Sequence, residues 1–243
     1  MRLRSDIDLE PALRRALESS IGLPCRVESA SGDPQAMIDG DFLPLPRGMA
    51  SELRIWSNSR CIVASRSQAT RREFSAACAV SERAGWPVAT RGSGGSAVVH
   101  RPGILNVSIR RRLPLDSQRW MTRGYETFLG HLISALELFA VDCDAGEVPG
   151  AYCDGRFNLR IGDRKLAGTA AHSGVRDGSR ICLFHASIVL SGSIRDDIAA
   201  IERFEAALGS VQRYEPAAHV SLAQLLAPAA VGNYEENLSH AVA

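Results

Sequence analysis

The chain has 243 residues and a formal net charge of +1, with 45% hydrophobic and 23% charged residues. This composition is typical of a soluble globular protein with one large domain, and it gives no electrostatic reason to expect binding to nucleic acid or to an anionic membrane. No apolar run approaches the roughly 18 residues that a membrane span needs.

The N-terminal part of the chain predicts one helix followed by short strands. Residues 8–21 carry apolar side chains at helical spacing and predict an amphipathic helix. Residues 29–51 are rich in Ser, Gly, Asp and Pro, which predicts a loop or a β-hairpin. Two apolar runs, 53–56 and 61–65, then predict a pair of strands.

A second helix is predicted to begin at Thr70. Thr70-Arg-Arg-Glu73 is a capping box, in which the hydroxyl and the carboxylate satisfy free N–H groups of the first turn. Gly85 is expected to end this helix in a left-handed conformation. Further strands are predicted at 86–89, 97–100 and 104–109.

The C-terminal half adds long helices and further strands. Residues 117–141 predict a long helix with Tyr125, Leu129 and Leu132 along one side. Strands are predicted at 157–161, 165–170 and 181–189, helices at 194–208 and 221–226, and a frayed tail after Gly232. This alternation of strands and helices, with several hairpin-like connections, predicts the α+β class.

The cysteines and the N-terminus predict a cytoplasmic protein. The first residues lack the apolar region of a secretory signal. The six cysteines show neither Cys-x-x-Cys pairing nor the spacing of a metal site. We therefore expect reduced thiols and no metal site.

A glycine-rich segment, Arg91-Gly-Ser-Gly94-Gly95-Ser, lies between two predicted strands. Such a loop leaves backbone N–H groups open to a ligand, and similar loops cradle phosphates. It lacks the Gly-Lys-[Ser/Thr] ending of a P-loop and the third glycine of Gly-x-Gly-x-x-Gly. On its residues alone, the segment is either a plain flexible turn or a ligand-binding loop.

A cysteine and a lysine follow about sixty residues later. Cys153 stands in Ala-Tyr-Cys153-Asp-Gly, beside a turn signal, and Lys165 follows in Lys165-Leu-Ala-Gly168-Thr169. A thiol and an amine on neighbouring elements suit acyl transfer through a thioester, because the thiol is a nucleophile and the ammonium favours its thiolate or polarises the acyl carbonyl. Taken alone, a buried packing cysteine and a surface lysine are the alternatives.

These segments, in this order and spacing, resemble the biotin/lipoate protein ligase superfamily. Its members carry Arg-x-Ser-Gly-Gly-Gly-Ala-Val-x-His, then Gly-x-Leu-Asn, then a Gly-x-Lys-x-x-Gly-x-Ala turn. The matching residues here are Arg91, Gly94, Gly95 and His100, then Gly103-Ile-Leu-Asn106, then Lys165, Gly168 and Thr169, with a weaker echo in Leu53–Trp56 and Ser65-Arg-Ser-Gln68. The resemblance covers about residues 52–190. It implies a mixed β-sheet flanked by α-helices, as a single catalytic domain over residues 1–243 with a helical C-terminal segment, 194–243.

Within the superfamily, the segment around Cys153 most resembles the cysteine-dependent octanoyl/lipoyl transferases, above all the amidotransferases that move the acyl group between lipoyl-carrier proteins. The resemblance implies that Cys153 forms an acyl-thioester and that Lys165 activates it. It also implies a substrate-binding set made of Arg91, Gly94, Gly95, His100, Asn106, Gly168 and Thr169.

Three histidines have less defined roles in this comparison. His100 is expected to buttress the glycine loop, with a general-base role as the alternative. His185 matches a histidine of many relatives and is expected to be structural. The role of His172 is open.

The resemblance also implies the partners. These are the lipoyl-carrier domains of the glycine cleavage H protein and of the acyltransferase subunits of 2-oxoacid dehydrogenases, with acyl carrier protein as a further donor. Carriers of this kind tend to be acidic, so Arg110-Arg111-Arg112 is either a solvated strand end or a docking point for one of them.

The transferase interpretation requires no cofactor. Thr90, Gly92 and Ser96 depart from family positions that surround an adenylate, which weakens the case for ATP. Two alternatives remain: an ATP- and Mg-dependent lipoate ligase that acts through a lipoyl-adenylate, and a non-catalytic acyl-binding scaffold. Whether the acyl group is octanoyl or lipoyl is left open.

Overall fold

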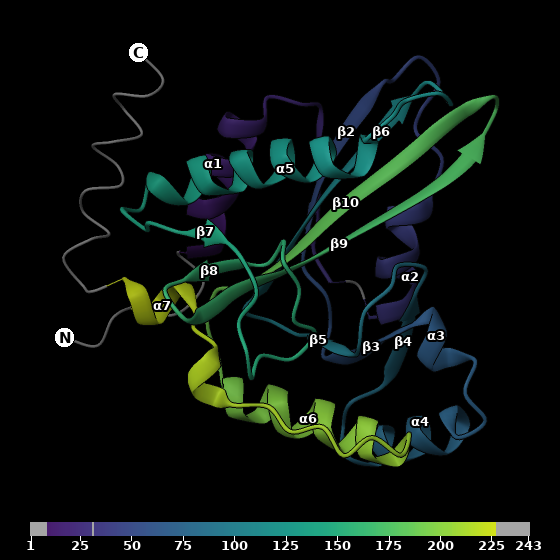
Figure 1. Ribbon diagram of the computed structural model, residues 1–243, viewed down its shortest axis with the longest axis vertical. Helices are drawn as coiled ribbons and strands as arrows, with labels where there is room; N and C mark the ends of the chain where they lie inside the picture. The colour runs from purple at the N-terminus through teal and green to yellow at the C-terminus, as the bar shows by residue number, and fades with distance from the viewer. Residues whose placement is uncertain (1–8, 31, 227–243) are drawn as a thin grey trace.

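A computed structural model describes residues 9–30 and 32–226 of the chain (Figure 1). In these residues the helices are α1 (Leu9–Ile21), α2 (Pro34–Asp39), α3 (Arg66–Ala69), α4 (Phe74–Arg83), α5 (Trp120–Glu137), α6 (Ile194–Ala207) and α7 (Leu222–Leu225), with 3-10 turns η1 (Gly40–Phe42) and η2 (Pro216–Ala218). The strands are β1 (Cys25–Glu28), β2 (Ser51–Trp56), β3 (Cys61–Ser65), β4 (Val88–Arg91), β5 (Val98–His100), β6 (Ile104–Leu113), β7 (Asp144–Ala145), β8 (Leu159–Ile161), β9 (Arg164–Arg176) and β10 (Ser179–Val189).

The larger sheet has the strand order β1-β2-β6-β10-β9-β8-β7 within the described residues. Its β1–β2 pair is parallel, and its other neighbouring pairs are antiparallel. Figure 1 shows α1 and α5 together against one side of this sheet. Their apolar stripes bury Leu13, Leu17, Phe128 and Leu132 against strand residues such as Phe184, which forms the main core.

The smaller sheet has the order β4-β3-β5, with β3 parallel to β4 and antiparallel to β5. Helices α4 and α6 lie beside it at the lower end of the view in Figure 1. Ile62, Ile201 and Phe204 are fully buried in the cluster between them. Helix α6 begins where the Ser193 hydroxyl accepts a hydrogen bond from the Asp196 N–H.

The longest hairpin joins β9 to β10 through Asp177 and Gly178. Both residues have positive φ angles, 51° and 67°, as a two-residue hairpin turn of the primed type requires. This turn fixes the register in which β9 and β10 cross the sheet. Together with the helices on both sheets, it confirms the predicted α+β class and the mixed sheet flanked by helices.

Several predicted elements are confirmed with shifted ends, while three predictions are wrong. The segment 29–51 contains α2 and η1, because Asp33 caps the Gln35 N–H and Pro34 occupies the first helical turn. Strands β2 and β3 do not pair, since β2 joins β1 and β6 in the larger sheet while β3 belongs to the smaller one.

The third error concerns the capping box. The Thr70 hydroxyl donates to the Ser67 carbonyl, and α4 begins only at Phe74 with no side-chain cap. The box observed here is formed by Ser65 and Gln68 at the start of α3. Gly85 does follow α4 with a positive φ of 78°, as predicted.

The arginine run is only partly solvated. Arg110 is buried and pairs with Glu52, whereas Arg111 is exposed and Arg112 is half-buried. The predicted tail after Gly232 lies outside the described residues. Among the helices of the described part, none combines the length and apolarity that a bilayer crossing requires.

Candidate active site

Two hollows meet at Cys153. The inner pocket encloses about 850 Å³ including its open mouth, and its walls are mostly apolar, with Val63, Val99, Ile104 and Leu183 among them. The outer groove also reaches Cys153 and is lined by Gly94, Gly95, Tyr125, Asp154–Asn158 and Thr169–Ala171. The Cys153 side chain and Thr169–Ala171 contribute to both hollows.

Cys153 lies in the loop between β7 and β8, which we call the Cys153 loop (residues 146–158). Its φ angle is +44°, a left-handed conformation that costs a non-glycine residue roughly 1–2 kcal/mol. The sulfur lies 3.8 Å from Arg91 Nη2. A Cβ atom at Gly95 would come within 2.8 Å of the sulfur, so a side chain at position 95 would displace it.

The other cysteines differ from Cys153 in their surroundings. Cys61, Cys143 and Cys182 are buried, and burial raises the pKa of each thiol, to about 12 for Cys61 and to about 11 for the other two. Cys25 is exposed on β1. None of these four lines the inner pocket or the outer groove.

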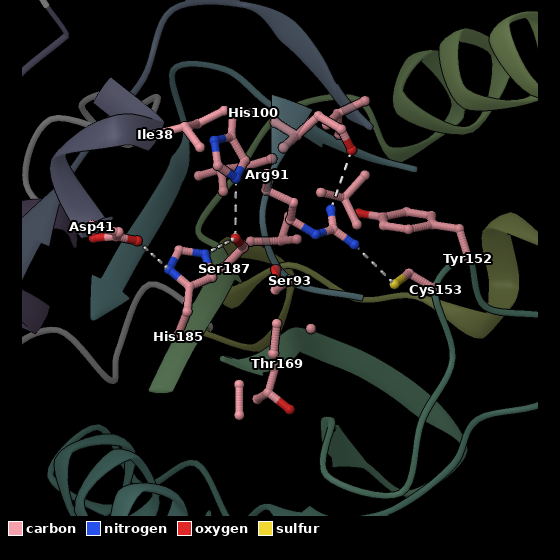
Figure 2. Close-up of a pocket in the computed structure, with 18 of the residues that line it drawn as sticks. Ile38, Asp41, Arg91, Ser93, His100, Tyr152, Cys153, Thr169, His185 and Ser187 are labelled. Carbon is pink, nitrogen blue, oxygen red and sulfur yellow. Dashed lines mark hydrogen bonds and ion pairs between the residues drawn. The ribbon is translucent and has the colours of Figure 1, made fainter. Parts of the chain in front are cut away.

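Arg91 ties the glycine loop to the sulfur. Its Nη2 donates to the carbonyls of Gly94 (2.9 Å) and Ser96 (2.8 Å), and its Nη1 donates to the Val63 carbonyl (3.2 Å). Burial lowers the pKa of the guanidinium, while the charge of Cys153 opposes this shift. Its Nε is buried without a hydrogen-bond partner among the described residues. The guanidinium therefore places a cation beside Cys153 (Figure 2).

Lys165 is buried at the start of β9 and points toward the Cys153 loop. Its Nζ donates to the carbonyls of Tyr152 (2.6 Å) and Cys153 (2.9 Å). Burial lowers the pKa of the ammonium from 10.5 to about 8, and the neighbouring Cys153 counteracts the shift. A Cβ at Gly168 would lie 3.3 Å from Nζ, so Gly168 leaves room for the lysine. The lysine thus grips the backbone of the loop, and the cation next to the sulfur is Arg91.

Thr169 holds the far end of the Cys153 loop. Its N–H donates to Asn158 Oδ1 (3.1 Å), and its hydroxyl donates to the Phe157 carbonyl (2.8 Å). Asn158 in turn donates to the Cys153 carbonyl at 3.3 Å. Asn158 belongs to no recognisable motif, so its role cannot be predicted from the sequence.

A polar cluster forms the wall of the inner pocket away from Cys153 (Figure 2). The Ser187 hydroxyl donates to Asn106 Oδ1 (2.7 Å), and the ring nitrogens His100 Nε2 (3.3 Å) and His185 Nε2 (3.1 Å) lie close to it. Asn106 itself is fully buried behind Ser187. Burial lowers the pKa of His100 well below 6.5, so its ring is neutral and supports the wall of the pocket.

Asp41, which no sequence motif marks, completes this cluster from η1. Its carboxylate lies 3.3 Å from His185 Nδ1 and pairs with the fully buried Arg54 at 2.9 Å. Burial alone would raise the pKa of Asp41, but hydrogen bonds and charge from His185 and Arg54 lower it overall. His172 is not part of the pocket wall and contacts the edge of Phe42.

The structure thus brings Arg91 and Gly95 to the Cys153 sulfur, while Lys165 and Thr169 bind the loop that carries it. Gly94 lines the outer groove, His100 lines the opposite wall of the inner pocket, and Asn106 is buried behind Ser187 in that wall. Within the part of the chain that the structure describes, no three His, Cys, Asp or Glu side chains are grouped to hold a metal ion.

A mixed sheet flanked by helices carries a largely apolar pocket that Cys153 helps to line. The chain belongs to the family described as the lipoyl protein ligase A/B catalytic domain, which matches residues 47–237.

Individual relatives support this assignment. An uncharacterised protein of Cupriavidus necator is 31% identical over 185 residues, which are 71% of this chain and 73% of that protein. An octanoyl-[GcvH]:protein N-octanoyltransferase of Kyrpidia tusciae is 33% identical over 48% of this chain and 40% of its own length. A lipoyl-[GcvH]:protein N-lipoyltransferase of Listeria monocytogenes is 38% identical over 36% of this chain and 31% of its own. The matched segments thus span less than half of these two transferases.

Solved structures share the fold. Lipoate-protein ligase A bound with ATP superposes with a TM-score of 0.60 at 17% identity, over 90% of this chain and 86% of that one. A bipartite lipoate protein ligase of Thermoplasma acidophilum, studied with its E2 lipoyl domain, gives a TM-score of 0.56 at 17% identity, over 90% and 84% of the two chains. These likenesses confirm the expected architecture.

Proposed function

We propose that this protein is an acyltransferase that moves an octanoyl or lipoyl group onto lipoyl-carrier domains through a thioester on Cys153. The observation that carries the proposal is the position of the sulfur, at the junction of an apolar pocket and an outer groove, 3.8 Å from a guanidinium. A cation beside a thiol favours the thiolate, which is the nucleophilic form.

In this proposal the Cys153 thiolate attacks the carbonyl carbon of the acyl group on a donor carrier. The bond from that carbon to the donor sulfur or nitrogen breaks, the donor leaves with a proton supplied by the Lys165 ammonium, and an acyl-thioester remains on Cys153. The ε-amine of a carrier lysine then attacks the thioester. The amide bond forms, the carbon–sulfur bond breaks, the thiolate returns, and the Lys165 amine takes up the proton that the carrier lysine loses.

The surrounding residues divide the work of this reaction. Arg91 stabilises the thiolate and the oxyanion that develops on the acyl oxygen. Lys165, whose pKa of about 8 is close to neutral pH, adds positive charge at the loop and is suited to move a proton during either step. The apolar wall of the inner pocket holds the alkyl chain, at about 0.8 kcal/mol for each buried CH₂ group.

The names of the relatives guide the choice of carriers. Several relatives are named for transfer from GcvH to protein, and one structural neighbour was studied with an E2 lipoyl domain. We therefore propose the glycine cleavage H protein and the acyltransferase subunits of 2-oxoacid dehydrogenases as carriers, with acyl carrier protein as a further donor. Both steps exchange one acyl bond for another, so we propose that the reaction needs neither ATP nor a metal. We also propose that it takes place in the cytoplasm.

The test is the intact mass of the protein after incubation with octanoylated GcvH or octanoyl-acyl carrier protein. We expect an added octanoyl mass that hydroxylamine removes, and its loss in Cys153→Ser. The matched control is Cys25→Ser, since Cys25 is exposed but lies outside both hollows. An absence of any adduct with every donor would favour the non-catalytic scaffold.

A second candidate is the ATP-dependent lipoate ligase, favoured by the shared fold with lipoate-protein ligase A bound with ATP. A ligase forms a lipoyl-adenylate and does not need the thiol. Lipoylation of a carrier by Cys153→Ser in the presence of free lipoate, ATP and Mg²⁺ would replace the proposed mechanism with this one.

A further inference from the structure

His219 lies between η2 and α7, far along the chain from Cys153, and its ring is buried in the wall of the inner pocket. The ring stacks on the Tyr152 ring, with centroids 4.6 Å apart and planes at 22°. The Tyr152 N–H donates to His219 Nε2 at 3.3 Å. The histidine therefore contacts the residue that precedes the nucleophile in two independent ways.

The hydrogen bonds of His219 define its tautomer. Nδ1 lies 3.0 Å from the Glu215 carbonyl oxygen, which can only accept, so Nδ1 carries the proton. Nε2 faces an N–H group and must therefore offer its lone pair. Burial and the charge of Lys165 lower the pKa of the ring to about 4, against the hydrogen bond to Glu215 that favours the protonated form, so the ring is neutral at neutral pH. A protonated ring would set two donors against each other at Tyr152.

The same segment also fixes the backbone beside the lysine. The Val220 N–H donates to the Lys165 carbonyl at 2.9 Å, and the Glu215 N–H donates to the Gly150 carbonyl at 2.9 Å. The Lys165 ammonium in turn binds the carbonyls of Tyr152 and Cys153. Tyr152 is thus held at its N–H by His219 and at its carbonyl by Lys165.

We infer that His219 is a positioning residue for the proposed acyl transfer: by accepting the Tyr152 N–H, its Nε2 holds Cys153 in the left-handed conformation that aims the sulfur at Arg91. This inference rests on the proposed function. It accounts for a strained cysteine that persists at φ +44°, since a non-glycine residue keeps such a conformation only where its surroundings hold it. His219 does not touch the sulfur in this role.

The test compares three substitutions that separate the acceptor from the ring. His219→Phe keeps an aromatic ring against Tyr152 and loses the acceptor. His219→Gln places an amide oxygen where Nε2 stands, whereas the shorter His219→Asn does not reach it. His131→Gln is the matched control, because His131 also places Nδ1 against a backbone carbonyl, that of Ser20, but lies on α5 outside the pocket.

Two rates are measured for each variant, namely acyl-enzyme formation from octanoylated GcvH and alkylation of Cys153 by iodoacetamide relative to exposed Cys25. We expect both rates to fall about tenfold in the Phe and Asn variants, the effect of one lost hydrogen bond, and to recover in the Gln variant. Thermal unfolding of each variant separates this effect from a loss of folded protein.

The inference would be overturned if both rates were the same in the three His219 variants. It would also be overturned if they fell as far in His219→Gln as in His219→Phe. The alkylation rate needs no carrier. A wild-type protein that forms no acyl-enzyme but shows the expected order of alkylation rates would reject the proposed function and leave the positioning of Cys153 supported.

Discussion

At the scale of single residues, two cations serve the Cys153 loop in different ways. Arg91 lies beside the sulfur, while Lys165 is buried and binds backbone carbonyls. Burial lowers the pKa of the Lys165 ammonium from 10.5 to about 8, so it loses its proton at a lower pH than a lysine in water does. This difference makes the stability of the protein depend on pH in a way that identifies the residue.

Lys165→Met is expected to flatten one part of the stability profile. Between pH 8 and 10.5 the unfolded chain holds a proton on Lys165 that the folded chain has lost, so the free energy of unfolding rises with pH. From about pH 7 to about pH 9.5 the free energy of unfolding of the wild type should gain roughly 2 kcal/mol relative to that of the variant, because the groups that titrate in both proteins cancel in this difference. Urea unfolding at the two pH values measures the difference, and parallel profiles would show that the ammonium is not buried as described.

The sequence indicates some residues of the site and not others. The motifs containing Cys153, Lys165 and the glycine loop are each continuous in sequence. Their resemblance to family motifs therefore predicts that these three segments lie close together in the fold. Asp41 and His219 come from segments without any local pattern, and only the folded chain brings them to the pocket wall. Which cation faces the sulfur also depends on side-chain geometry that no spacing encodes.

At the scale of elements, periodic apolar segments were predictable and pairings were not. Helices α1, α5 and α6 follow their apolar stripes, because an amphipathic helix buries one face wherever it docks. Strands β2 and β3 are neighbours in sequence but enter different sheets, a choice decided by long-range contacts. The short helix α2 depends on the cap at Asp33 within a segment of loop-like composition.

Two glycines in α5 give opposite predictions for the same substitution. A Cβ at Gly124 would lie 1.9 Å from the Phe184 ring, whereas a Cβ at Gly130 has no neighbour within 4 Å. Gly124→Ala should therefore destabilise the protein by about 1–3 kcal/mol through overpacking. Gly130→Ala should stabilise it by up to about 1 kcal/mol, since alanine favours the helix. Urea unfolding of both variants measures the contrast, and equal shifts would contradict this packing of α5 on the sheet.

At the scale of the whole molecule, one buried ion pair fastens the helix layer to the sheets. Arg101 follows β5 and donates to both carboxylate oxygens of Asp197 on α6, at 2.6 Å each. It also donates to the Ser191 carbonyl just beyond β10 (2.7 Å). The small sheet, the large sheet and α6 therefore meet at one guanidinium.

Arg101→Met should cost about 3–5 kcal/mol, because it leaves the Asp197 carboxylate buried without its partner. The double variant Arg101→Met, Asp197→Leu should recover most of this loss, since the buried charge is then absent as well. Chemical denaturation measures the free energy of unfolding of the wild type, the single variant and the double variant. A double variant as unstable as the single one would show that the packing of the arginine stem, rather than its charge, joins the layers.

Cys153 lines both the inner pocket and the outer groove. In the proposed transfer, the donor carrier and the acceptor carrier must bind at this same sulfur one after the other. An acceptor carrier that binds before the acyl-enzyme has formed therefore blocks the donor carrier. An excess of unmodified acceptor should then inhibit its own acylation.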